Sequence, residues 1–349
     1  MYRREFSELI KLAAPLVIAQ LAQNTLSFVD TLMVGRLGNN SLAGIALGGT
    51  IFHFVLIVLS GVIFGVNPIV SQAIGAGDRK KAAIALRQGL WIGVVMFIPA
   101  FIFYWNAYPI MIWLKQDPET AHASSEYLKA ISWGLLPALW MMSLRGFLEG
   151  NSNTLPIMVI AIMGIGANIV LNYALMFGKF GCPELGLVGT GYASSIVYIC
   201  GFLLLASYIA WKYFDQQIFT RFGAPNVTMI KELFRVGGPI GLTLGFEMGM
   251  FSAAAIAMGT LSAVELAAHQ IALQSAATSF MIPLGIAIAT SVRVGLATGA
   301  GEMDTARIAG YTGGFFAFWF MSSISSTLTC YFRRPCHSVQ PAEESNDVE

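Results

Sequence analysis

The tetrapeptide Gly75-Ala76-Gly77-Asp78 returns as Gly299-Ala300-Gly301-Glu302, 224 residues further along the chain. The same offset relates further pairs without a gap, namely Pro15–Pro239, Gly35–Gly259, Leu37–Leu261, Leu42–Leu266, Ala43–Ala267, Ala82–Ala306 and Gly89–Gly313. Many matches in one frame indicate an internal repeat. Internal repeats are typical of secondary transporters, whose substrate site lies between the copies. We therefore predict a protein built from two related units.

The repeated tetrapeptide does not resemble a phosphate-binding loop. No strand is predicted before either copy, and no Gly-Lys-Ser or Gly-Lys-Thr follows. A glycine just after a helix commonly adopts the left-handed conformation that ends it. We predict that both copies terminate helices, on the cytoplasmic side.

The composition is that of an integral membrane protein. Hydrophobic residues make up 56% of the chain and charged residues 11%, where soluble domains have about 25% charged residues. The mean hydropathy is +0.68. A net charge of +1 gives no reason to expect a nucleic-acid partner, and the four cysteines lack metal-site spacing. The lipid bilayer is thus the expected surrounding.

Apolar runs long enough to cross a bilayer occur along most of the chain. We predict transmembrane helices over 12–35, 45–70, 88–114, 130–146, 155–177, 187–211, 236–259, 266–292 and 308–332. Lys and Arg are more frequent in the loops on one side, which is the side of the N-terminus. The positive-inside rule then predicts a multi-pass protein of the inner (plasma) membrane with a cytoplasmic N-terminus.

The two predicted units differ in length. Residues 1–224 contain six runs and form an N-lobe, whereas 225–332 contain only three runs of a C-lobe. Residues 333–349 form a polar tail that we expect to be non-native, as after a frameshift or an early stop. We therefore expect a truncated second lobe, which leaves open whether the chain transports; the alternative is a natural short form with a polar tail.

Two acidic residues lie well inside predicted spans, Asp30 and Glu247. A carboxylate at membrane depth is costly and is usually retained for an ion or a proton. Asn168 and Asn172 lie one turn apart on one helix face, and amide oxygens together with a carboxylate suit a hard cation such as Na⁺. The alternative is that these groups only form hydrogen bonds between helices. For His269-Gln270 we favour a packed polar pair.

Several segments together resemble the multidrug and toxic compound extrusion (MATE) family, in its NorM-type bacterial branch. They are Pro15–Gln20, Phe28–Gly35, Arg145–Gly150, Ala167–Gly186, Ala268–Ala272 and Val292–Gly295. The resemblance implies an all-α fold of two six-helix lobes, here with a complete N-lobe and about three helices of the C-lobe. It also implies efflux of organic cations or drugs in exchange for Na⁺ or H⁺, without a cofactor.

The resemblance further implies roles for individual residues. Asp30 would be the cation or proton site of the N-lobe, with Asn168 and Asn172 as partners and Ser194 as a hydroxyl ligand. Glu247 would be the acidic site of the C-lobe, but the acidic partner that the family has on its tenth helix lies outside this sequence.

Two other functions compete with drug efflux. A lipid-linked oligosaccharide flippase of the same superfamily would favour several cationic residues in a central cavity, and we find them only near the helix ends. A membrane-embedded enzyme would need clustered acidic, histidine or nucleophilic residues at one depth. Asp30 and Glu247 fall in equivalent helices of different lobes, which argues against one catalytic pair.

Overall fold

A computed structural model describes residues 2–216, 218, 223–261 and 263–332. These ranges are helical, apart from short connections. The long helices are α1 (Tyr2–Val34), α2 (Asn39–Ile63), α4 (Arg79–Trp105), α6 (Pro118–Gly150), α7 (Leu155–Met176), α8 (Leu187–Lys212), α9 (Val227–Leu261), α10 (Ala263–Gly299) and α11 (Met303–Phe332). The short ones are η1 (Gly35–Leu37), α3 (Val66–Gly75), α5 (Ala107–Trp113) and η2 (Phe214–Gln216). The tail 333–349 lies outside the described residues.

The long helices have the length and composition of membrane spans. In the described part of the chain, seven segments are apolar and long enough to cross a bilayer, with α2 and α3 counted together. Helices α9 and α11 cover two further predicted runs, 236–259 and 308–332. The prediction of an all-α membrane protein is therefore confirmed.

Two predicted runs are not single helices. The run 45–70 is interrupted at Phe64-Gly65, between α2 and α3. Pro68 lies four residues beyond Phe64, where its ring would clash with the Phe64 carbonyl and where it has no N–H to donate to it. The run 88–114 is likewise interrupted at Asn106, between α4 and α5. Sequence hydropathy does not register such breaks, because the apolar character continues through them.

The repeated tetrapeptides end α3 and α10 in the same way. Gly77 and Gly301 have φ values of +75° and +79°, in the region that favours glycine. The N–H of Gly77 donates to the Ile74 carbonyl, and the N–H of Gly301 donates to the equivalent Thr298 carbonyl. The predicted helix-terminating role is confirmed.

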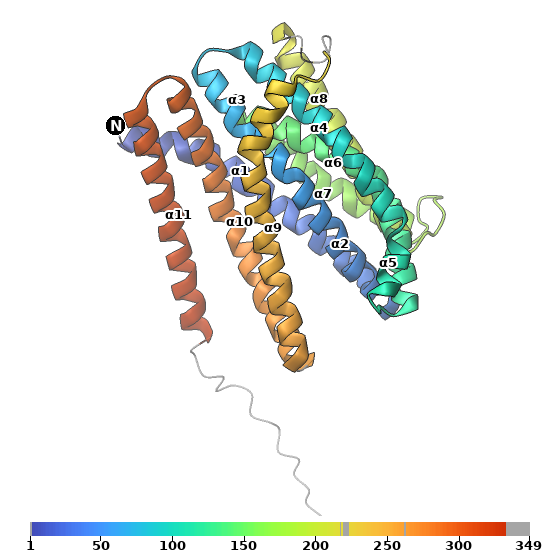
Figure 1. Cartoon of the computed structure of the whole chain (residues 1–349). Helices are drawn as coiled ribbons and strands as arrows, with labels where there is room; N and C mark the ends of the chain where they lie inside the picture. Colours follow the sequence, from blue (N-terminus) through green and yellow to red (C-terminus); the bar gives the residue numbers. More distant parts are fainter. Residues whose placement is uncertain (1, 217, 219–222, 262, 333–349) are drawn as a thin grey trace, which may run out of the picture.

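Figure 1 shows how helices α9–α11 are arranged relative to helices α1–α8. Helices α9–α11 meet α1 and α3 at the end of the molecule that carries the N-terminus, and at the opposite end they run apart from α2 and α5. We call the first of these the closed end. Helix α10 packs on α1 and α3, and α9 packs on α2.

Glycines at the closed end allow backbones to touch. A Cβ on Gly75 would overlap the Leu296 carbonyl, and a Cβ on Gly299 would overlap the Gln72 carbonyl. The 224-residue offset converts the first contact into the second, with the two halves exchanged. Close approach through small residues is the usual way membrane helices pack. The two repeats thus meet around a pseudo-twofold axis.

Candidate functional site

Asp30 lies in α1 with its side chain buried against α7 and α8. The amide nitrogen of Asn172 donates to Oδ1 of Asp30 at 2.6 Å, and the Ser194 hydroxyl donates to Oδ2 at 3.1 Å. The same Asn172 nitrogen also donates to Oδ1 of Asn168 at 3.1 Å. The structure therefore brings together four of the five residues singled out from the sequence. We call these four residues the Asp30 cluster.

Helix α7 presents its amides inward because its two faces differ. Asn168 and Asn172 are fully buried, whereas Ile169 and Val170 on the other face are exposed. In a bilayer the apolar face meets lipid and the polar face turns toward neighbouring helices. The i, i+4 spacing then places both amides opposite α1.

The hydrogen bonds of the Asp30 cluster are incomplete. Oδ1 of Asn172 and Nδ2 of Asn168 are buried and have no hydrogen-bond partner among the described residues. Unpaired buried polar atoms are uncommon in proteins, and they are expected where an ion or a water molecule binds. Up to five oxygens from Asp30, Asn168, Asn172 and Ser194 lie in this cluster, which matches the preference of hard cations for oxygen.

Glu247 does not join the Asp30 cluster. It lies near the middle of α9 and is partly exposed. Within the described part of the chain it makes no hydrogen bond or ion pair. Helix α9 packs on α2, α4 and α10, whereas the Asp30 cluster lies between α1, α7 and α8. The side chains of His269 and Gln270, which we expected to form a packed pair, lie outside those that the structure describes.

Sequence reasoning did not single out two further buried acidic residues, Glu5 and Glu149. Glu149 near the end of α6 is buried, and it accepts a hydrogen bond from Asn67 at 2.7 Å. Arg145 lies 3.9 Å from the Glu149 carboxylate and donates to Gln20 of α1 at 2.9 Å. The predicted span ends at residue 146, so Glu149 falls outside it. Its i, i+4 spacing from Arg145 was the available signal.

A polar contact also joins α2 to α1. His53 of α2 is exposed and contacts the carbonyl of Gly49 through Nδ1 at 2.8 Å. Because a carbonyl only accepts, Nδ1 carries the proton in this contact. Nε2 lies 3.4 Å from the Ser27 hydroxyl of α1. Nearby on α1, Asn24 donates to Thr278 of α10 at 3.0 Å.

An apolar groove of about 480 Å³ runs along the seam between α1 and α7. Its lining residues are Val29, Leu32, Met33, Arg36, Ile169, Val170, Tyr173 and Phe180. Val29 and Tyr173, which adjoin Asp30 and Asn172 in the chain, thus line the groove. The side chains of Asp30 and Asn172 instead form a hydrogen bond with each other.

The MatE family model matches the chain twice, over residues 15–174 and 239–344. The two matches begin at Pro15 and Pro239, which is the 224-residue offset of the repeat. The chain belongs to the MATE family. The resemblance drawn from the sequence is therefore confirmed, and so is the expectation that the chain is a transporter and not an enzyme.

Named relatives agree with this assignment. A probable multidrug resistance protein NorM from Pseudomonas aeruginosa is 38% identical over 91% of this chain and 67% of its own length. The multidrug resistance protein NorM of Aliivibrio fischeri is 34% identical over 95% of the chain and 72% of its own length. The multidrug resistance protein MdtK of Yersinia enterocolitica is 36% identical over 89% and 69%. The chain thus spans about two thirds of the length of these MATE relatives.

Solved structures show the same fold. A MATE protein in complex with MaD3S superposes with a TM-score of 0.83 at 21% identity, covering 94% of this chain and 74% of that one. The eukaryotic MATE transporter AtDTX14 superposes with a TM-score of 0.80 at 23% identity, covering 89% and 69%. The arrangement of helices is therefore that of MATE transporters.

Proposed function

We propose that this chain exports drugs or organic cations across the inner membrane in exchange for Na⁺ or H⁺. The names of its relatives support drug efflux, and the Asp30 cluster supports ion coupling. One observation carries the second part. A carboxylate at membrane depth accepts hydrogen bonds from one amide and one hydroxyl of two other helices, a second amide bonds the first, and one amide oxygen is left unpaired.

We infer that a cation or a proton would bind at the Asp30 carboxylate. In the observed arrangement Asn172 uses its nitrogen for both Asp30 and Asn168, so its oxygen has no role. A cation or a proton on Asp30 would give this oxygen a partner once the amide turned. Binding of the cation or proton would then join α1 and α7 through contacts that differ from those of the unbound Asp30 carboxylate. An ion can shift an equilibrium only through such differential contacts.

The substrate would bind between the two sets of helices. We assign Glu247 of α9 to this region as the acidic site of the second lobe, with α1–α8 forming the first lobe and α9–α11 belonging to the second. Its partly exposed carboxylate would attract an organic cation, and apolar side chains would contact the remainder. His53 and Asn24 add polar groups on the facing helices.

The excess of Lys and Arg on the side of the N-terminus supports a cytoplasmic closed end. A reporter fused after Trp211 would then read as cytoplasmic, and one fused after Gly181 as external. The opposite pair of signals would contradict this orientation.

Transport by purified protein in lipid vesicles tests the proposal. The full chain would be reconstituted with a fluorescent organic cation such as ethidium, and a Na⁺ or pH gradient would be imposed. We expect gradient-dependent movement of ethidium, reduced about ten-fold or more in Asp30→Asn. Asp117→Asn, at an exposed helix cap, is the matched control and keeps wild-type transport.

Two outcomes would contradict the proposal. Equal transport by wild type and Asp30→Asn would remove the role of Asp30. No gradient-dependent movement of any organic cation by the wild type would remove drug efflux, and movement of a labelled lipid-linked oligosaccharide in its place would favour a flippase.

A further inference from the structure

An ion pair joins the two repeats at the closed end. Arg293 of α10 donates to both carboxylate oxygens of Glu5 at the start of α1, through Nη2 at 2.6 and 2.8 Å and through Nε at 3.2 Å. The side chains are 22% and 10% exposed, so water screens this pair poorly. A bidentate arginine–carboxylate contact is among the strongest polar links in proteins.

This ion pair has no counterpart on the other side of the pseudo-twofold axis. The glycine contacts of the closed end occur twice: Gly61 meets Gly241, and the equivalent Gly285 meets Val17. The ion pair occurs once. The 224-residue offset places Ile69 and Met229 at the positions equivalent to Arg293 and Glu5, and both are buried apolar residues. We call the Glu5–Arg293 side the charged side and the Ile69–Met229 side the apolar side, although a half-exposed ion pair, Lys81–Glu232, lies one turn beyond Met229.

The charged side and the apolar side respond differently to opening. Water that enters an opened interface solvates a separated carboxylate and a separated guanidinium, which offsets much of the lost attraction. Water that enters an apolar contact gains nothing comparable, because exposed apolar surface is unfavourable. Separating the two halves therefore costs less free energy on the charged side than on the apolar side.

We propose that Glu5 and Arg293 form a one-sided latch, which holds the closed end shut and separates first when that end opens. They are positioning residues, since neither lies in the Asp30 cluster. The proposal rests on the proposed function in one respect: a transporter must open this end at some stage of its cycle.

The latch predicts an order among four variants. Glu5→Gln or Arg293→Gln leaves one buried charge without its partner, which raises the energy of the closed state alone. Both variants should open more often. Glu5→Met combined with Arg293→Ile copies the apolar side onto the charged side and should open no more than the wild type. Glu5→Arg combined with Arg293→Glu restores a pair and should stay near the wild-type rate.

Cysteine labelling in lipid nanodiscs measures the opening directly. Ser71 is fully buried and faces Gly295 across the interface, so Ser71→Cys reports on the closed end. Ser124 of α6 is also fully buried and bonds Gly44 of α2, so Ser124→Cys reports on general unfolding. Each reporter is placed in a chain whose native cysteines are replaced by serine, and its reaction with a water-soluble maleimide is timed. No drug or gradient is needed, so a failure of transport does not affect this test.

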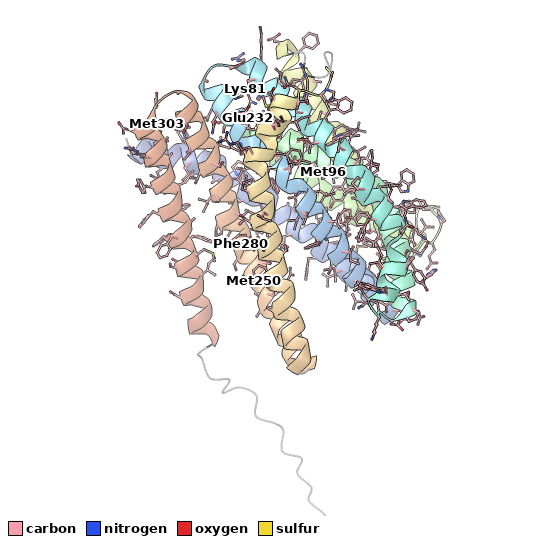
Figure 2. All side chains as sticks on the ribbon, in the orientation of Figure 1. Lys81, Met96, Glu232, Met250, Phe280 and Met303 are labelled. Atoms are coloured by element: carbon pink, nitrogen blue, oxygen red, sulfur yellow. The ribbon has the colours of Figure 1, made fainter. Side chains whose placement is uncertain are left out.

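The expected result is a rise of about ten-fold or more in Ser71→Cys labelling for each single variant, with Ser124→Cys unchanged. The control Lys81→Gln removes a half-exposed ion pair with Glu232 that also joins the two halves (Figure 2), and it should stay within about two-fold of wild type. Wild-type labelling in both single variants would overturn the latch. The latch would also be overturned if the Glu5→Met/Arg293→Ile variant were labelled as fast as the single variants. A faster labelling of both Ser71→Cys and Ser124→Cys would overturn it as well.

Discussion

Asn172 is the residue on which the Asp30 carboxylate most depends. Its amide makes the shortest bond to Asp30 and also bonds Asn168, so one side chain links α1 to two positions of α7. All three side chains are buried, with no bulk water to replace a lost donor. The Asp30 cluster is therefore sensitive to the loss of this single amide.

We expect Asn172→Ala to lower the free energy of unfolding by about 1–3 kcal/mol, because buried oxygens of Asp30 and Asn168 lose their donor. Asn106→Ala is the matched control: that amide is exposed and bonds only the Ile102 carbonyl of its own helix. Thermal unfolding of the two purified variants in detergent makes the comparison. An equal effect in both would show that the Asn172 contact contributes nothing specific.

At the residue scale, spacing and membrane depth were the informative signals in the sequence. Asp30 stood alone in an apolar run, and the i, i+4 asparagines pointed to one face, so their juxtaposition could be anticipated. Ser194 is one hydroxyl in a helix with several, and only the family resemblance selected it. Glu149 was missed because its burial depends on where α6 ends, and hydropathy places helix ends poorly.

At the scale of helices, the closed end is held by glycines whose contacts leave no space for a side chain. A Cβ on Gly61 of α2 would overlap the Gly241 backbone of α9. Gly49 of the same helix has no such atom within 4 Å among the described residues. The two glycines therefore differ in what an added methyl group meets, and not in helix propensity.

We expect Gly61→Ala to destabilise the chain by about 1–3 kcal/mol, because α2 and α9 must separate to admit the methyl group. Gly49→Ala should instead stabilise it by about 0.5–1 kcal/mol, since alanine restricts the unfolded chain more than glycine does. Unfolding midpoints of both variants in one detergent decide the matter. A Gly61→Ala chain as stable as Gly49→Ala would contradict the observed contact.

The sequence predicted which segments are helical better than it predicted where each helix begins and ends. Each predicted run is helical over most of its length, but the runs 45–70 and 88–114 are each divided between two helices, and the break between α2 and α3 could be found only by weighing the position of Pro68. Which helix faces meet could not be derived at all. That depends on backbone approach at Gly61 and Gly75, which only the folded chain reveals.

For the whole molecule, the offset of 224 residues accounts for most of the architecture. It relates two equivalent helix ends, two sets of glycine contacts and two matches to one family model. The sequence could supply the repeat but not its axis, since identical segments can pack in several ways. The Glu5–Arg293 pair departs from the symmetry, because the equivalent positions hold the buried apolar residues Ile69 and Met229.

The central claim is that the Asp30 cluster binds the coupling ion. The most direct measurement is the unfolding midpoint of the purified full chain across a Na⁺ titration at fixed pH, and across a pH series at fixed salt. A ligand that binds only the folded state at 100 times its dissociation constant adds about 2.7 kcal/mol of stability. We predict that one of the two series shifts the wild-type midpoint and that Asp30→Asn abolishes that shift, while Asp117→Asn keeps it. A wild-type response in Asp30→Asn would contradict the claim.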